Sequence, residues 1–162
     1  MRRRMEKSRT TAAAEPVDER VGFSFYEEDL KALRDLLGAL RARKVRVPRT
    51  YLVRALAHVV SEDEMFAHAV TRHRQEQAGK AGAAGEVEQH LAFNLLTDDV
   101  DKLSRVGDKL ADQGFRGVRS FIIRSLIHAP WELDALTRQL GKFQKEFPDP
   151  RSREGRARRH RG

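Results

Sequence analysis

Two clusters of arginine and hydroxyl residues are the strongest candidates for chemistry in this sequence. Each holds two arginines and one hydroxyl residue: Arg46, Arg49 and Thr50, and seventy positions later Arg116, Arg119 and Ser120. A guanidinium group matches the geometry of phosphate oxygens, and free backbone amides at a helix start attract an anion. The pattern predicts two phosphate contacts of the same design, with ordinary helix capping by Thr50 and Ser120 as the alternative.

Other kinds of reactive site are missing from the sequence. The six histidines have no metal-ligand spacing, since His68 and His73 are five residues apart rather than four. The chain has no cysteine, so neither a thiolate site nor a disulfide can form. It also lacks a glycine-rich nucleotide loop and a nucleophile motif. We therefore predict a protein that is not an enzyme and uses no cofactor, metal ion or small-molecule substrate.

The two clusters belong to a longer internal repeat. RVGFSFYEEDLKALRDLLGAL aligns without a gap with HLAFNLLTDDVDKLSRVGDKL, and VRVPRTYLVRALAH aligns with FRGVRSFIIRSLIH at the same offset. The identical pairs include Phe23/Phe93, Asp29/Asp99, Arg54/Arg124 and His58/His128. Chance does not explain a match of this length, so two structural units of one kind are expected.

Each unit begins with an alternating segment. Apolar side chains at Val21, Phe23 and Phe25 alternate with Gly22 and Ser24, a period of two that predicts a half-buried strand. An acidic start and apolar residues at helical spacing follow, which predict a first helix that ends near Lys44. A second helix is expected to start at Pro48.

The second copy repeats this order, with a strand over residues 91–95, a first helix that ends at Gly114 and a second helix from Val118. A lone strand with two helices leaves its backbone hydrogen-bonding groups unpaired. We therefore expect strand 21–25 to pair antiparallel with strand 91–95 of the same chain. In the second helices, His58 and His128 are predicted to interact with the helix dipole, and Arg54 and Arg124 to pair with acidic residues on a neighbouring helix.

Two further helices are expected outside the repeat. The predicted organisation is a basic disordered arm at 1–19, a first copy at 20–60, an extra helix with a Gly/Ala linker at 61–89, a second copy at 90–130, a C-terminal helix at 131–148 and a basic disordered tail at 149–162. The last helix carries an apolar stripe of Leu136, Leu140, Phe143 and Phe147. That stripe packs on the body, binds a second copy or docks a partner protein.

The net charge of +8 is located at the two ends of the chain. Residues 1–10 hold five Arg/Lys against one Glu, and residues 149–162 hold six Arg against two acids, so each end carries +4 and the remainder is neutral. Such ends neutralise phosphates by counterion release, or they serve as solubilising tails. No apolar run is long enough for a membrane span, so we expect a cytoplasmic protein without a membrane partner.

The start of the second helix carries a resemblance to a known family. RTYLVRAL and RSFIIRSL resemble the Arg-Ser-x-aliphatic-aliphatic-Arg pattern of the ribbon-helix-helix superfamily of the MetJ/Arc type, over roughly residues 20–60 and 90–130. Two copies in one chain resemble conjugative relaxosome accessory proteins of the TraY kind. The resemblance implies a mainly α fold with a two-stranded antiparallel ribbon, built as an intramolecular pseudo-dimer with interlocked helices.

The resemblance also implies which residues contact DNA, because paired strands of this family enter the major groove. The outward positions expected to read bases are Arg20, Gly22, Ser24, His90, Ala92 and Asn94. Asn94 suits adenine and Arg20 suits guanine, whereas Gly22 reads almost nothing. The alternative is that these residues form only the solvated face of a surface ribbon.

We therefore expect a double-stranded DNA-binding protein associated with a bacterial nucleoid. It is a transcriptional repressor, or an accessory factor at a DNA-processing site such as a transfer origin. The alternative is an antitoxin-like or scaffold module that binds DNA weakly and binds a protein partner or itself through the C-terminal helix.

Overall fold

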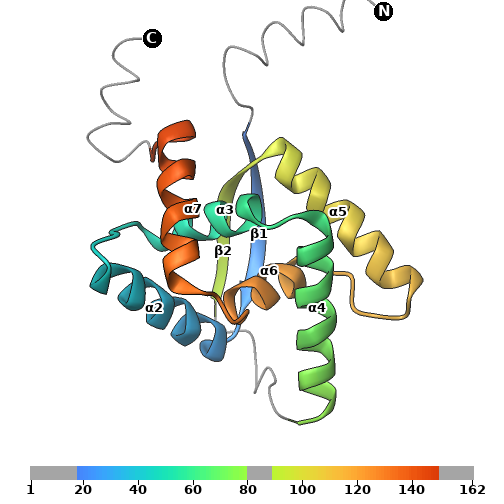
Figure 1. Ribbon diagram of the computed structural model, residues 1–162. Helices are drawn as coiled ribbons and strands as arrows, with labels where there is room; N and C mark the ends of the chain where they lie inside the picture. Colours follow the sequence, from blue (N-terminus) through green and yellow to red (C-terminus); the bar gives the residue numbers. More distant parts are fainter. Residues whose placement is uncertain (1–17, 80–88, 150–162) are drawn as a thin grey trace, which may run out of the picture.

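A computed structural model of the protein describes residues 18–79 and 89–149 (Figure 1). Each half holds one strand followed by three helices: β1 (Asp18–Phe25), α2 (Glu27–Ala42), α3 (Arg49–Val59) and α4 (Glu62–Gln77), then β2 (Gln89–Leu96), α5 (Thr97–Asp112), α6 (Arg119–Ile127) and α7 (Leu133–Glu146). The described residues are mainly helical and contain one two-stranded antiparallel sheet, which confirms the expected class at that level.

The two strands pair antiparallel within the chain, as expected, and their register is symmetric. Gly22 lies opposite Ala92, the residue seventy positions later that is its equivalent in the repeat. Arg20 therefore lies opposite Asn94, and Ser24 lies opposite His90. The pairing is centred on the Gly22–Ala92 pair, so the two halves are placed equivalently about the middle of the ribbon.

The inner face of the ribbon forms one wall of the hydrophobic core. Phe23, Phe25, Phe93 and Leu95 are at most 2% exposed, because successive side chains of a strand point to opposite faces. The ring of Phe93 contacts both phenylalanines of β1, with centroids 5.7 and 5.8 Å apart. Burial of each such side chain contributes about 1.5–3 kcal/mol to folding.

The helices of the two halves interlock beneath this face. Helix α3 of the first half packs on β2 of the second half, and α6 of the second half packs on β1 of the first. Helices α3 and α6 also contact each other across the centre of the molecule (Figure 1). Neither half therefore encloses a core of its own, because each supplies the helix that covers the other's strand.

The third helices occupy equivalent positions in the two halves, although they lie outside the gapless sequence repeat. Helix α4 packs on α5 and α6, and α7 packs on α2 and α3, so each third helix covers the opposite half (Figure 1). Their buried positions correspond at an offset one residue longer than that of the repeat: Met65, Ala69 and Arg72 in α4, and Leu136, Leu140 and Phe143 in α7. Ser61 and Glu132 begin these helices as capping residues at the same offset.

The apolar stripe of the C-terminal helix packs on the body. Phe143 and Phe147 lie against the His58 ring, with centroids 5.1 and 5.2 Å away. The hydroxyl of Tyr51 donates a hydrogen bond of 2.6 Å to the carbonyl oxygen of Phe147. Trp131, at the approach to α7, donates its indole N–H to the Leu126 carbonyl oxygen at 2.7 Å. Helix α7 is thus held to α3 and α6 by polar as well as aromatic contacts.

Several predicted boundaries shift by one or two residues. β1 begins at Asp18, inside the stretch expected to be an arm, and β2 begins at Gln89. The second helices begin at Arg49 and Arg119, one residue after the predicted starts. The Gly/Ala linker over residues 80–88 and most of both basic ends, residues 1–17 and 150–162, lie outside the described residues. Within the described residues, no helix combines the length and the apolar character needed to span a membrane.

The first helices of the two halves end in the same way. Lys44 has φ +65° and its repeat equivalent Gly114 has φ +81°, both in the left-handed region. The next amides donate back to the helices, from Val45 to the Leu40 oxygen at 3.0 Å and from Phe115 to the Leu110 oxygen at 2.8 Å. Glycine takes this conformation without steric strain, whereas lysine does not.

We therefore predict that Lys44→Gly raises the free energy of unfolding by about 0.5–1 kcal/mol, since relief of left-handed strain exceeds the entropy cost of glycine. Urea unfolding monitored by circular dichroism measures the change. Gly114→Ala is the matched control and should lower stability by about 1 kcal/mol. A loss of stability in Lys44→Gly would contradict the proposed strain.

Candidate nucleic-acid interface

The six predicted base-reading residues share the outer face of the ribbon. They are Arg20, Gly22, Ser24, His90, Ala92 and Asn94, and they alternate with the buried residues of the inner face. Arg20, Gly22, His90 and Asn94 are exposed, while Ser24 and Ala92 are half-buried. The alternation read from the sequence is confirmed, and it leaves a narrow polar surface with small residues at its middle.

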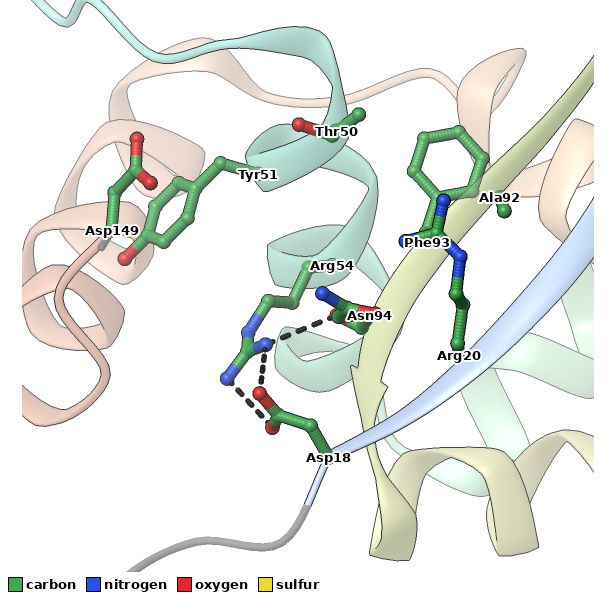
Figure 2. A pocket seen from close by; sticks show the side chains of 9 residues that line it. All are labelled: Asp18, Arg20, Thr50, Tyr51, Arg54, Ala92, Phe93, Asn94 and Asp149. Carbon is green, nitrogen blue, oxygen red and sulfur yellow. Dashed lines mark hydrogen bonds and ion pairs between the residues drawn. The ribbon is translucent and has the colours of Figure 1, made fainter. Parts of the chain in front are cut away.

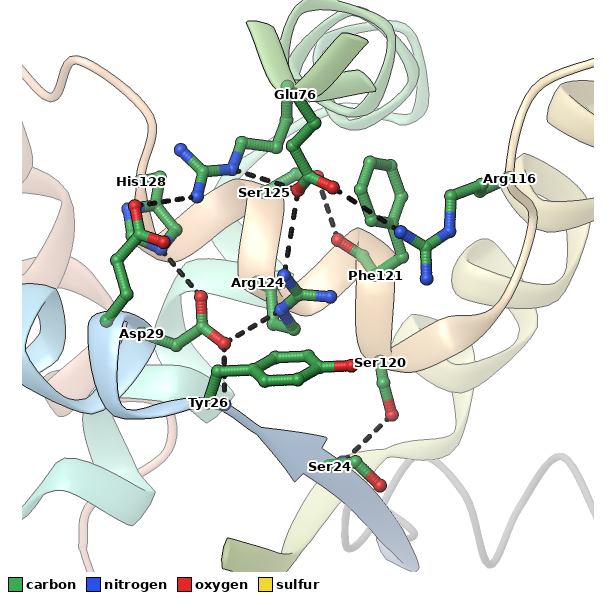
Figure 3. A network of polar contacts seen from close by, with 12 residues as sticks. Ser24, Tyr26, Asp29, Glu76, Arg116, Ser120, Phe121, Arg124, Ser125 and His128 are labelled. Carbon is green, nitrogen blue, oxygen red and sulfur yellow. Dashed lines mark hydrogen bonds and ion pairs between the residues drawn. The ribbon is translucent and has the colours of Figure 1, made fainter. Parts of the chain in front are cut away.

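One end of this outer face is closed by hydrogen bonds. The Ser24 hydroxyl and His90 Nδ1 lie 2.8 Å apart across the ribbon. The Ser24 amide donates to the hydroxyl of Ser120, at the start of α6, at 2.9 Å (Figure 3). The hydroxyl residue of the second half therefore contacts the strand of the first half.

The other end is more open and more highly charged. A cavity of about 290 Å³ lies between the ribbon and α3, and Arg20, Thr50, Arg54 and Asn94 line it (Figure 2). Asp18 and Asp149 also line this cavity. The described part of the chain therefore begins and ends beside this end of the ribbon.

Arg54 makes the main polar contacts in this cavity. Its Nη1 and Nη2 atoms donate to the two carboxylate oxygens of Asp18, at 2.9 and 3.0 Å (Figure 2). Nη1 also donates to the Asn94 carbonyl oxygen at 3.1 Å. The predicted acidic partner of Arg54 was a residue on a neighbouring helix. That prediction is wrong, because the partner is on β1.

The arginines expected to contact phosphate have two kinds of surroundings. Arg46, Arg49 and Arg119 are exposed, and none of them forms an ion pair with another described residue. Arg116 instead lies 3.4 Å from Glu76 of α4, and its guanidinium stacks over the Phe121 ring at 4.8 Å. Arg116 is therefore engaged with the body, while the other three are available to an anion.

Thr50 and Ser120 do not cap their helices. The residues at the cap positions are Pro48 and Val118, and no side chain accepts a cap hydrogen bond at either start. The alternative explanation of Thr50 and Ser120 as ordinary capping residues is therefore wrong. Both hydroxyl residues instead lie beside the strand of the opposite half, because Thr50 borders the cavity at Asn94.

A close backbone contact sets the position of the α6 start. A Cβ atom added to Gly107 of α5 would lie 2.6 Å from the Gly117 carbonyl oxygen, so the loop before α6 rests directly on α5. The equivalent positions in the first half are Leu37 and Val47, whose side chains prevent so close an approach. The two helix starts are therefore not placed identically relative to their first helices.

A buried ionic cluster joins the halves beneath the ribbon. Asp29 of α2 is fully buried and receives a hydrogen bond from Arg124 Nε at 2.8 Å, while its other carboxylate oxygen lies 2.7 Å from His128 Nε2 (Figure 3). Burial raises the pKa of the Asp29 carboxyl, but hydrogen bonds from His128 and the Tyr26 amide, with the charge of Arg124, outweigh it and lower the pKa overall. Arg124 thus pairs with an acid on a neighbouring helix, as predicted.

A second ionic cluster surrounds Asp99, the repeat equivalent of Asp29, and its cation is a lysine rather than an arginine. Asp99 lies 3.0 Å from His58 Nδ1, which mirrors the Asp29–His128 pair. Lys102 Nζ lies 3.5 Å from Asp99 and donates to the Val60 carbonyl oxygen at 2.6 Å, at the end of α3. Both histidines therefore pair with an aspartate of the opposite half. This contact is additional to the interaction with the helix dipole that the sequence predicted.

Sequence reasoning missed Asp18, Arg54 and Lys102 as residues that shape this surface. Asp18 was assigned to the arm, and Arg54 was treated as equivalent to Arg124. The sequence held a clue to the role of Lys102. Its equivalent in the repeat is Ala32, so Asp99 has a lysine three residues later and Asp29 does not.

Comparison with protein-family models, curated proteins and solved structures finds no match to this chain. Within the described residues, no group of three or more histidine or acidic side chains is arranged to hold a metal ion. The function therefore has to be inferred from the geometry of the ribbon and the helix starts beside it.

The Asp29 cluster generates a stability prediction. Because the folded-state pKa of Asp29 is lowered, its contribution is complete above the usual pKa of 3.8 and is lost as pH falls through the folded value. Asp29→Asn should lower the free energy of unfolding at neutral pH by about 3–5 kcal/mol, since Arg124 and His128 lose their buried anion. Urea unfolding from pH 7 to pH 3 measures both effects.

Asp134→Asn is the matched control, because the Asp134 side chain is 70% exposed and pairs with Arg43 at the surface. It should change stability by less than about 1 kcal/mol and leave the acid dependence intact. Equal effects of the two substitutions would show that the Asp29 cluster does not hold the halves together.

Proposed function

We propose that this protein binds double-stranded DNA by inserting the β1–β2 ribbon into the major groove, as an intramolecular ribbon-helix-helix pseudo-dimer. The observation that carries the proposal is the outer face of the ribbon, which presents the polar side chains of Arg20, Ser24, His90 and Asn94 opposite the buried apolar residues of the inner face. The major groove of B-form DNA admits a two-stranded β-ribbon of this kind.

The symmetry of the pairing supports the pseudo-dimer. Two identical units related by a twofold axis pair their strands about equivalent residues, as Gly22 and Ala92 do here. The exchange of α3 and α6 between halves and the matching Asp–His pairs follow the same symmetry. These features support an internal arrangement like that of a dimer of single units.

The positions of the cations support DNA as the partner. Arg49 and Arg119 are exposed at the starts of α3 and α6, where free backbone amides favour a phosphate oxygen. Thr50 and Ser120 border the ribbon next to them. The excess charge of the two chain ends adds contacts to phosphate that do not depend on sequence.

The ribbon presents different side chains at its two ends. Arg20 and Asn94 at one end can make bidentate contacts with guanine and adenine, whereas Ser24 and His90 at the other end bind each other. Gly22 and Ala92 at the middle offer little beyond contact with a thymine methyl group. We propose that the protein recognises a non-palindromic site, which suits a repressor with an asymmetric operator or an accessory factor at a transfer-origin-like site in a bacterial nucleoid.

An antitoxin-like or scaffold role through the C-terminal helix is less well supported. Leu136, Leu140 and Phe143 of α7 are buried against the first half, so this stripe is not available to a partner without unpacking the helix. The exposed arginines and the polar face of the ribbon, in contrast, are not packed in the core and can contact a partner.

Selection of bound fragments from a genomic DNA library by the full-length protein tests the proposal. The expected result is a non-palindromic consensus and an affinity that falls steeply between 50 and 200 mM salt, as about 6–10 phosphate contacts would require. Binding that is absent or insensitive to salt would overturn the proposed function. A palindromic consensus would retain DNA binding and overturn the asymmetric recognition.

Single substitutions separate base contacts from phosphate contacts. Asn94→Ala should weaken binding to the selected site by about 1–3 kcal/mol and relax base preference at one half of it. Arg49→Ala and Arg119→Ala should weaken binding to all sequences alike. Fluorescence anisotropy titrations on the selected site and on single-base variants measure both effects. Unaltered preference at every base in Asn94→Ala would rule out its contact with a base.

A further inference from the structure

Arg54 and Arg124 are identical in the repeat but have different environments in the structure. The Arg124 side chain is 3% exposed and is bound to Asp29 in the core, whereas the Arg54 side chain is 14% exposed and is directed to the edge of the ribbon. The repeat equivalent of Asp29 is Asp99, and Arg54 does not pair with it. Arg54 therefore shares the repeat position of the buried Arg124 but lies at the edge of the ribbon.

Lys102 takes the place beside Asp99 that Arg124 has beside Asp29. It supplies the cation beside Asp99, at 3.5 Å, and its 12% exposure places it inside the same interface between the halves. Its equivalent in the first half is Ala32, so Asp29 has no such lysine and keeps Arg124. The asymmetry follows from which cation neutralises each buried aspartate. It leaves the Arg54 guanidinium beside Arg20 and Asn94, without a counterpart from Arg124 at the Ser24–His90 end.

The Arg54 guanidinium lies between the ribbon and the start of α3. It borders the cavity that Arg20, Thr50 and Asn94 also line (Figure 2). Both of its outer nitrogens bind the Asp18 carboxylate, which is 42% exposed, and its Nε has no hydrogen-bond partner within the described part of the chain. The planar fork that holds this carboxylate matches two oxygens of a phosphate equally well.

We propose that the Asp18 carboxylate occupies, in the free protein, the place that a DNA phosphate takes on Arg54 in the complex. This inference rests on the proposed function. When the ribbon enters the groove, the phosphates repel Asp18, and one of them replaces it on the guanidinium. Asp18 therefore limits affinity for DNA in general, and Arg54 adds one phosphate contact on the Asn94 side of the site, with no counterpart on the Ser24–His90 side.

The partially exposed setting of the pair is what makes this exchange feasible. An ion pair that solvent reaches is weakly held, so the carboxylate can be displaced by a competing anion without unfolding the strand end. The Asp29–Arg124 pair is fully buried and cannot exchange in this way. The same two residue types thus serve as a core contact in one half and as a replaceable contact in the other.

A double-mutant cycle on the full-length protein tests the proposal. Affinities of the wild type, Asp18→Asn, Arg54→Gln and the double variant are measured by anisotropy on a random duplex and on the selected site. Asp18→Asn should bind both DNAs about three- to tenfold more tightly, because Arg54 is free to meet phosphate. In the Arg54→Gln background the same substitution should have less than about a twofold effect.

Glu19→Gln is the matched control, because Glu19 is the neighbouring exposed acid of β1 and forms no ion pair with a described residue. It removes the same charge and should change affinity by less than about twofold. Circular dichroism verifies that every variant folds, and Arg54→Lys replaces Arg54→Gln if the latter does not, since lysine keeps the charge and loses the fork.

The position of the contact provides a second readout. Ethylation of one phosphate on the Asn94 flank of the selected site should interfere with binding of the wild type and of Asp18→Asn, but not with binding of Arg54→Gln or of the double variant. An equal gain from Glu19→Gln, or a gain that persists without Arg54, would overturn the inference while DNA binding itself stands. Absence of salt-sensitive binding in every variant would overturn the proposed function, and this inference with it.

Discussion

The structure depends on the need of a single β-strand for a partner. Within the described residues β1 and β2 have no other strand beside them, and the backbone groups on their facing edges are satisfied because the two strands of one chain pair along their full length. Once the strands are paired about Gly22 and Ala92, the apolar face of each strand is covered by the helix of the opposite half. The core is therefore shared, and separation of the halves would expose Phe23, Phe25 and Phe93 to water.

The core shared by the two halves contains buried charged side chains that need partners of opposite charge. Asp29 and Asp99 start the first helices of the two halves, and each pairs with the histidine that ends the second helix of the other half, His128 or His58. A carboxylate enclosed in this way requires a cation nearby. Arg124 supplies it in one case and Lys102 in the other, so the same requirement is met by different residues. The consequence reaches the surface, because Arg54 is free to lie beside the ribbon.

Much of the fold could be predicted from the sequence, because period-two and helical patterns report directly which side of each element is buried. The outward residues of the ribbon and the intramolecular pairing of the strands were predicted correctly, while the third helices were assigned outside the repeat. In α4 the contacts of Arg72 and Glu76 are ionic, whereas Phe143 of α7 and the residue that caps this helix, Phe147, make aromatic contacts. Because α4 and α7 make different kinds of contact, their equivalence is evident from their positions in the structure and hardly detectable from their sequences.

By itself the sequence determined the repeat, the element order, the inner and outer faces of the ribbon and the location of excess charge, because each is a property of local spacing and composition. Only the tertiary structure decided which cation neutralises Asp99, that Asp18 belongs to β1 and binds Arg54, and that Arg116 is engaged by Glu76. Asp18 and Arg54 are 36 positions apart and Glu76 and Arg116 are 40 positions apart, whereas Lys102 is three positions from Asp99 and competes there with Arg54 of the other half. Competition among alternative ion pairs is resolved by packing, and no local pattern in the sequence records its outcome.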